Sequence, residues 1–348
     1  MDNRLAIDPL QPCATADISK DNVARFQVAS LWRARWQLIN SLIPYALLWF
    51  VMDRALLVSY WLMLPIAILA AGFLVRIFII FHDCGHGSFF RSKRANNATG
   101  TLAGLVLLTP YWHWRWQHSL HHGTAGDLDR RGSGDIWTLT VQEYLQSGRA
   151  RRIAYRLARN PFVLFVIAPV YLFVVQHRFA SPTAPRRERR SVHLTNWALL
   201  ATVLVMSALI GLKALLLIQL TVSAFAGALG LWLFYVQHQF AGAYWARSAD
   251  WNYTAAALQG SSFYKLPRIL QWFTGNIGFH HIHHLSPRIP NYHLQRCHDA
   301  DPFFKTIKPL TLLTSLKCLT HRLWDEQRNV FVGFGHLSLL GLTAPFGR

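Results

Sequence analysis

Long apolar stretches alternate with short polar ones along this chain, and four stretches are apolar enough to predict membrane-spanning helices. They cover residues 37–52, 56–81, 196–210 and 214–236. A bilayer crossing takes about 20 mostly apolar residues, so the first stretch is short by this measure. Asp53 and Arg54 break the first pair of stretches, and a turn at 211–213 breaks the second pair. The pattern therefore predicts two helical hairpins.

Three histidine clusters lie beside these stretches. The candidate metal ligands are His82 and His86, then His118, His121 and His122, then His280, His283 and His284. Residues at i, i+3 and i+4 share one face of a helix, so each cluster can direct its imidazoles to one side. His281 falls off that face, and we expect it either to support a ligand from behind or to face solvent.

His238 is a ninth candidate, because it follows directly on the last apolar stretch. An ionisable residue at such a depth is by default a functional one. The other histidines are interpreted as ordinary polar residues: His113, His177, His193, His293, His298, His321 and His336.

The number of clustered histidines indicates the kind of site. Imidazole binds iron, copper, zinc and nickel, so the ligand type alone does not name the metal. A structural zinc site needs only four ligands, and eight clustered histidines exceed that number, which predicts two metal ions with open positions. The three glutamates, Glu143, Glu188 and Glu326, do not lie three residues before a histidine, which excludes a carboxylate-bridged site of the Glu-x-x-His type.

The histidine clusters and the arginines together predict the topology. All clusters must reach one side of the membrane, so an even number of crossings separates them. Two weaker apolar stretches, 99–109 and 161–175, lie between the hairpins. A single crossing by 161–175 would put the third cluster on the opposite side of the membrane from the second. Because this stretch also contains Pro161 and Pro169, it is interpreted as an interfacial or re-entrant helix. Basic runs lie on the histidine side, which places the site and both termini in the cytoplasm.

Composition agrees with a membrane protein. Of the 348 residues, 52% are hydrophobic, and a soluble domain would struggle to bury that much apolar surface. The chain has a net charge of +19, and its basic residues cluster in runs at 91–94, 149–152 and 186–190 between apolar stretches. This placement favours contact with anionic lipid, and we expect no nucleic-acid partner. The cysteines, Cys13, Cys84, Cys297 and Cys318, have no disulfide or cluster spacing and are expected to be free thiols.

The predicted fold is an all-α integral membrane protein. Four transmembrane helices form two hairpins, and a cytoplasmic helical cap holds a histidine-rich dimetal site. We divide the chain into an N-terminal cytoplasmic segment (1–36), a membrane domain (37–300) and a C-terminal cytoplasmic segment (301–348). The aromatic tract 111–116 is interpreted as a belt at the level of the lipid head groups.

The three clusters read HxxxH, HxxHH and HxxHH, and over residues 35–300 the chain resembles the membrane fatty acid desaturase family. The tracts 260–268 and 275–288 resemble bacterial acyl-lipid desaturases, including those of Δ12 (omega-6) type. The resemblance implies a non-haem di-iron centre, O₂ as co-substrate and an acyl lipid as substrate, in the bacterial cytoplasmic membrane. No His-Pro-Gly-Gly haem signature is present, so an external electron donor, a ferredoxin, is expected.

Two other functions were weighed. A hydroxylase or ketolase acting on alkanes, sterols or carotenoids would use the same scaffold, but the flanks around Lys265 and Ser286 favour the desaturase. A metal transporter or sensor would line its path with polar groups, whereas the predicted spans, Asp53 and Arg54 aside, are almost free of charge. The acyl carrier, whether glycerolipid, acyl carrier protein or coenzyme A, stays open at this point.

Overall fold

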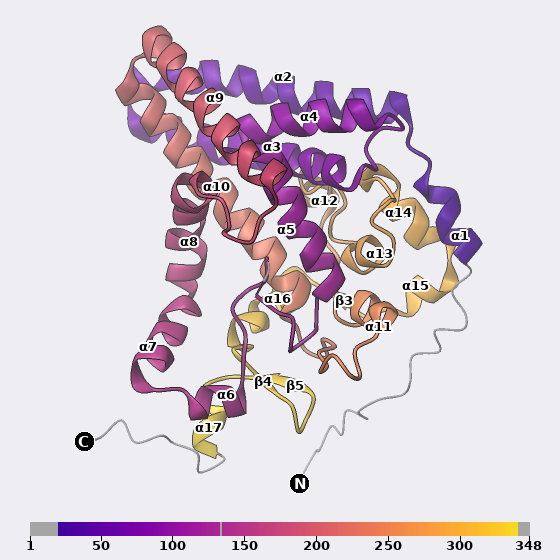
Figure 1. Ribbon diagram of the computed structural model, residues 1–348. Coiled ribbons are helices and arrows are strands. Elements are labelled where there is room, and N and C mark those ends of the chain that lie inside the picture. The colour runs from indigo at the N-terminus through magenta and orange to yellow at the C-terminus, as the bar shows by residue number, and fades with distance from the viewer. Residues whose placement is uncertain (1–19, 133, 340–348) are drawn as a thin grey trace.

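The computed structural model describes residues 20–132 and 134–339, which are mostly helical and contain two long hairpins (Figure 1). In the first hairpin, α2 (Leu31–Leu56) pairs with α3 (Tyr60–His86). In the second, α9 (Arg186–Ile210) pairs with α10 (Leu212–His238). Because α10 also packs against α3, the two hairpins form one bundle.

Local chemistry determines where the helices of the first hairpin begin and end. The hydroxyl of Ser30 accepts a hydrogen bond from the backbone N–H of Arg33 and caps α2, and Ser59 caps α3 in the same way. Gly87 follows α3 with a φ of 71°, in the left-handed region that glycine adopts without strain. The helix therefore stops directly after His86.

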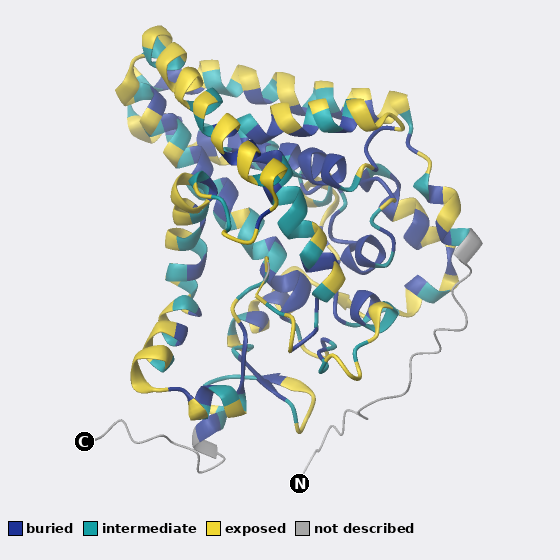
Figure 2. Ribbon diagram, viewed as in Figure 1, coloured by how far each residue is buried: buried dark blue, intermediate teal, exposed yellow. Residues whose placement is uncertain are grey.

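Three helices of the described chain are long and apolar enough to cross a bilayer: α3, α9 and α10. They contain three of the four predicted spans, and α9 begins ten residues earlier than the predicted stretch, at Arg186. Figure 2 shows α9 as largely exposed, and only 6% of its apolar window is buried inside the protein. A helix with such an exposed apolar surface is suited to contact lipid.

The first predicted span, 37–52, is helical but belongs to the longer helix α2, which is not among the three. Arg33 and Arg35 lie near the start of α2, and Asp53 and Arg54 lie near its end. The apolar part of α2 between these charges is shorter than the roughly 20 residues that a membrane crossing takes. A crossing by α2 therefore stays a prediction.

The weaker stretch 161–175 forms a bent element. Helix α7 (Arg149–Ala158) leads into a second helical segment, Val163–Arg178, which turns away from it by 64°. We call Val163–Arg178 the bent segment; it contains α8 (Ala168–Val170) between two π-helical turns. Together with α7 it is apolar enough for a broken span or a re-entrant loop, and the sequence predicts an interfacial or re-entrant element of this kind.

After α10, short elements form a cap beside the ends of α3 and α10 (Figure 1). Its helices are α11 (Tyr253–Leu258), α12 (Arg268–Phe273), α13 (His280–Leu285), α14 (Asn291–Ala300), α15 (Pro302–Thr306) and α16 (Leu312–Ser315). Helix α17 (His336–Leu339) lies apart from these, in the same buried cluster as Tyr144 and Tyr155. The remaining helices are α1 (Lys20–Ala24), α4 (Lys93–Val106), α5 (Tyr111–Thr124) and α6 (Val141–Gln146).

The prediction of an all-α fold is wrong in one respect, because two small sheets are present. Strands β1 (Leu139–Thr140), β4 (Leu323–Asp325) and β5 (Val330–Val332) form one sheet. Strands β2 (Phe263–Tyr264) and β3 (Pro309–Leu310) pair in parallel in the other. Extended connections in the cap pair their backbone groups with one another, since buried N–H and C=O groups need partners.

A charged side chain lies inside the second predicted span, where the sequence argument expected none. Arg76 of α3 is buried; it donates to the hydroxyl of Ser41 at 3.1 Å and to the backbone oxygen of Trp272. Its guanidinium carbon also lies 3.9 Å from the centre of the Trp272 ring. These contacts tie α3 to α2 and α12, so the charge is satisfied within the packed structure.

Parts of the predicted terminal segments lie outside the described residues. These are residues 1–19, which include Cys13, and residues 340–348, so both chain ends are among them. The other cysteines, Cys84, Cys297 and Cys318, are buried free thiols, as expected.

The close packing of the bent segment on α10 can be tested at Gly227. A Cβ added there would lie 2.6 Å from Cβ of Pro169, whereas one added at Gly230 would meet open space. We predict that Gly227→Ala lowers the free energy of unfolding by about 1–3 kcal/mol, because a rigid proline cannot yield. Gly230→Ala should raise it by up to about 1 kcal/mol through helix propensity. Thermal unfolding of the purified protein in detergent measures both, and effects of the same sign would contradict this packing.

Candidate metal centre

All nine histidines predicted from the sequence converge at one place in the structure. They come from the last turns of α3 and α10, from the second half of α5, and from α13 in the cap. Their nitrogens divide into two groups, which we call the five-histidine group and the four-histidine group.

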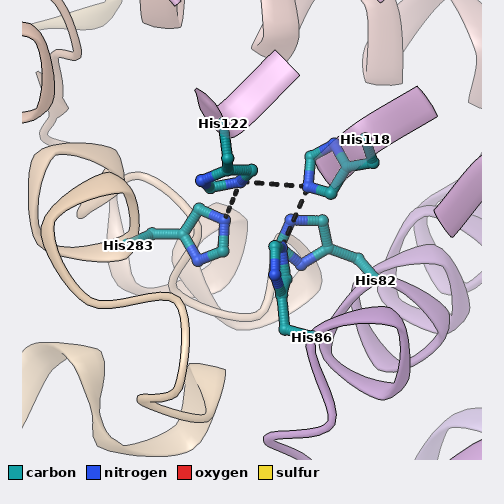
Figure 3. A group of neighbouring side chains, drawn as sticks. All are labelled: His82, His86, His118, His122 and His283. Carbon is teal, nitrogen blue, oxygen red and sulfur yellow. Dashed lines mark hydrogen bonds between the residues drawn. The ribbon is translucent and has the colours of Figure 1, made fainter. Parts of the chain in front are cut away.

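The five-histidine group is shown in Figure 3, where the rings turn toward one another. It consists of His82 and His86 from α3, His118 and His122 from α5, and His283 from α13. One nitrogen of each ring lies within 4.8 Å of the others. The Nε2 atoms of His86 and His118 are 3.0 Å apart, and those of His122 and His283 are also 3.0 Å apart.

The four-histidine group is centred on His238. Its Nε2 lies 3.2 Å from Nε2 of His121 and 3.1 Å from Nε2 of His280. His284 completes the group, since a nitrogen of its ring lies within 4.8 Å of those of His121 and His238. The structure therefore brings His238 together with members of the second and third clusters.

Each of the two later clusters contributes to both groups. On α5, His118 and His122 enter the five-histidine group and His121 enters the other. On α13, His283 enters the five-histidine group, whereas His284 and His280 belong to the other. The expectation that each cluster acts as one face is therefore refined: helical spacing places the rings side by side, but they point into neighbouring groups.

Hydrogen bonds at Nδ1 orient three of the rings. Asp83 lies 3.1 Å from Nδ1 of His82, and Asp135 lies 2.6 Å from Nδ1 of His121. Nδ1 of His238 lies 3.2 Å from the backbone oxygen of Gly260. An acceptor at Nδ1 keeps the proton there and leaves Nε2 as a free lone pair, which is the usual arrangement behind a metal-binding histidine.

Asp83 also fastens the cap to the membrane helices. Its second carboxylate oxygen accepts hydrogen bonds from the backbone and side-chain N–H groups of Asn291, at 2.6 and 2.8 Å. On the other side of α13, the hydroxyl of Tyr253 donates to the backbone oxygen of His284 at 2.6 Å. The third cluster is thus held over the first two by buried polar contacts.

Burial lowers the pKa of the clustered histidines outside the membrane-spanning helices. These are His118, His122, His280, His283 and His284. The pKa of each lies well below its ordinary value, first because burial removes water from the charged form, and then because neighbouring imidazoles would repel a second charge. The rings are neutral at pH 7, and neutral imidazole is the form that binds a metal.

These residues fit a pair of metal ions. Two nitrogens bound about 2.1 Å from one ion lie roughly 3.0–3.4 Å apart, and the close Nε2 pairs at 3.0–3.2 Å match that spacing. Nε2 of His284 is buried without a hydrogen-bond partner among the described residues, which is costly unless another ligand satisfies it. The donor set is all imidazole, which suits iron and other transition metals.

The sequence argument missed three residues beside the centre. Asp83 and Asp135 carry no motif of their own, although Asp83 directly follows His82 and Asp135 lies in the polar loop after the second cluster. Trp114 stacks on His118, with ring centres 4.5 Å apart. The tract 111–116 is therefore not simply a head-group belt, since Trp114 packs on the centre and Tyr111 is buried.

His281 does not face solvent, and that expectation was wrong. Its ring is fully buried and contacts Phe263, His298 and Phe304 in the cap, on the side of α13 away from the two groups. Burial lowers the pKa of His281 to about 3, so it is neutral. The histidines interpreted as ordinary polar residues do not enter either group within the described chain.

Comparisons with known proteins point to one family. The family model described as fatty acid desaturase matches residues 59–308, which include all nine histidines. A fatty acid desaturase of Bacillus subtilis is 46% identical over 323 residues, which cover 93% of this chain and 92% of that protein. Two Synechocystis proteins are also similar. An sn-1 oleoyl-lipid 12-desaturase is 28% identical over 69% of this chain and 68% of its own length. An sn-1 acyl-lipid omega-3 desaturase (ferredoxin) is 30% identical over 72% of this chain and 68% of its own length.

The hydrogen bond between Asp135 and His121 gives a test of the four-histidine group. Loss of such a supporting carboxylate lowers metal affinity by roughly 10–100-fold. We predict that Asp135→Leu lowers the metal content of the purified protein toward half, whereas Asp135→Asn, which keeps an acceptor oxygen, retains more. Asp250→Asn on an exposed loop serves as the control. Elemental mass spectrometry measures the content, and equal occupancy in all three variants would contradict the role of Asp135.

Proposed function

Because this chain belongs to the fatty acid desaturase family, whose members are oxidoreductases, we propose that it introduces a cis double bond into the acyl chain of a membrane lipid. The observation that carries the proposal is the convergence of nine histidines, seven buried and two half-buried, into two groups at the ends of apolar helices. The acyl-lipid substrates named for the two Synechocystis relatives support the choice of substrate.

We propose that the two groups hold two iron ions. His82, His86, His118, His122 and His283 would bind one ion, and His121, His238, His280 and His284 would bind the other. When bound, the irons supply the activation of O₂, so that one CH₂–CH₂ unit, O₂, two electrons and two protons yield CH=CH and two waters.

The chain's own residues prepare this chemistry in three ways. The imidazoles would direct their Nε2 lone pairs at the ions, and Asp83 and Asp135 hold two of those rings in orientation. Trp114 and Phe234 pack against His118 and His121 and exclude water from the centre. The apolar surfaces of α3 and α10 adjoin the site, so an acyl chain can approach without leaving an apolar environment.

The electron donor is proposed to be a separate protein. A ferredoxin is named for the omega-3 relative from Synechocystis and for a chloroplastic omega-3 desaturase of Arabidopsis thaliana that is 27% identical to this chain. We place the site and the basic runs on the cytoplasmic side, since arginine-rich loops are retained there.

Product analysis tests this function. We expect expression in a bacterium with a working ferredoxin system to yield an unsaturated acyl species that is absent from cells without the gene. His121→Ala should abolish it, because His121 and His238 converge with their Nε2 atoms 3.2 Å apart. Mass spectrometry of the membrane fatty acids measures the product and locates its double bond.

His281→Leu is the matched control. It removes a buried histidine from the third cluster whose ring packs on Phe263, His298 and Phe304, and we expect the unsaturated species and the metal content to persist. Oxygen incorporated into the product would instead indicate a hydroxylase or ketolase. Full activity in His121→Ala would remove that residue from the proposed ligand set.

A further inference from the structure

A cavity of about 420 Å³ lies beside the five-histidine group, at the end of α3. Its wall includes His86 and Ser88, the side chain of Gln27, and two arginines, Arg91 and Arg288. The volume is within the range of pockets that hold small molecules, and it is too small to receive the surface of a protein.

The charge of this cavity is unbalanced. No acidic residue lines it among the described residues, and both arginines are exposed. Nε of Arg91 donates to the backbone oxygen of Ala29 at 3.1 Å, which fixes the side chain and leaves its terminal N–H groups for another acceptor. Two guanidinium groups beside one cavity favour an anion, and their paired donors suit the oxygens of a phosphate.

The cavity lies where lipid phosphates lie. His86 is the last residue of a helix long enough to cross the bilayer, so the loop that follows it is at the membrane surface. Gln27 and Ala29 directly precede α2, whose first turns carry the exposed and mutually stacked Trp32 and Trp36. Exposed tryptophans gather at the head-group level of membranes, which places the cavity at that level.

We propose that this cavity binds the phosphate group of the glycerophospholipid that carries the acyl chain. The inference rests on the proposed desaturase function and names its substrate class. Arg91 and Arg288 hold the phosphate, and Gln27, one of whose amide N–H groups donates to Ser286 at 3.1 Å, has a second amide N–H to donate to a phosphate oxygen. Because His86 lines the same cavity and its Nε2 is 3.0 Å from that of His118, the head group is held next to the metal centre.

The experiment compares two lipids and two pairs of substitutions. The holoenzyme is placed in nanodiscs of phosphatidylglycerol or of an uncharged glucosyl diacylglycerol with the same acyl chains. Arg91→Gln with Arg288→Gln removes the proposed anion site. Arg149→Gln with Arg151→Gln on α7 removes the same charge at exposed positions outside the cavity.

We expect the native enzyme to form double bonds faster in phosphatidylglycerol by roughly tenfold, the effect of about one charge-assisted hydrogen bond. The cavity variant should lose this preference, and the α7 variant should keep it. Both variants should keep the native metal content and the native rate on the glucosyl lipid. Millimolar inorganic phosphate should not change the rate on the glucosyl lipid.

Other outcomes overturn the proposal. Equal native rates on the two lipids would show that the phosphate is not recognised. A changed rate with inorganic phosphate would indicate a site for free anions. A variant that needs more ferredoxin but keeps its lipid preference would make the arginines part of a docking surface for an acidic protein. If no double bond forms in either lipid, the desaturase function itself fails, which separates the two hypotheses.

Discussion

Nine imidazole rings meet at one place, and the site depends on which of their nitrogens carry protons. The closest Nε2 atoms are 3.0–3.2 Å apart, so rings that turned N–H groups inward would set donor against donor. The chain meets this requirement with acceptors placed behind the rings. Asp83, Asp135 and the backbone oxygen of Gly260 each accept a hydrogen bond from the Nδ1–H of one ring, so the lone pair at Nε2 is left facing inward. This arrangement holds the candidate ligands in position, but it leaves several buried imidazole nitrogens, such as Nε2 of His284, without a hydrogen-bond partner in the described chain.

The same polar contacts join the membrane helices to the cap. Asp83 is in the last part of α3, yet it accepts two hydrogen bonds from Asn291 at the start of α14, and the residues are 208 positions apart in sequence. α13 ends a few residues before Asn291, so this contact also holds α13 near α3, and Tyr253 donates a second hydrogen bond to the backbone of α13 at His284. Because one carboxylate both orients His82 and holds the cap, assembly of the site and closure of the cap are coupled. The apolar helices supply an environment of low polarity in which these few hydrogen bonds are strong.

Most of the ligand set could be predicted from sequence, since histidine spacing on a helix and adjacency to apolar stretches are local properties. His238 was found in the same way, from its position at the end of a span. The residues that support these histidines could not be predicted from sequence. Asp135 comes close to His121 only because of the path of the loop that carries it, and nothing in the sequence pairs Asp83 with Asn291. The hairpins were likewise predictable from hydropathy, but Arg76 was overlooked, and its burial against Ser41 and Trp272 is a tertiary property. The bend of 64° after α7 falls at Pro161, which can be read in the sequence, whereas the close approach of Pro169 to Gly227 is a tertiary contact that cannot.

In the proposed dimetal centre, the division of the clusters between two groups takes the role that a bridging carboxylate has in other dimetal proteins. A bridging glutamate holds two ions at a set separation, and in the described chain neither group contains a glutamate. Here α5 gives His118 and His122 to one group and His121 to the other, and α13 is shared in the same manner. Adjacent residues on one helix cannot move independently, so the distance between the groups is set by the geometry of the helix backbone. α3 and α10 each serve a single group, and they are packed against one another along the bundle. The relative position of the two groups is therefore determined by the helices that contribute to them.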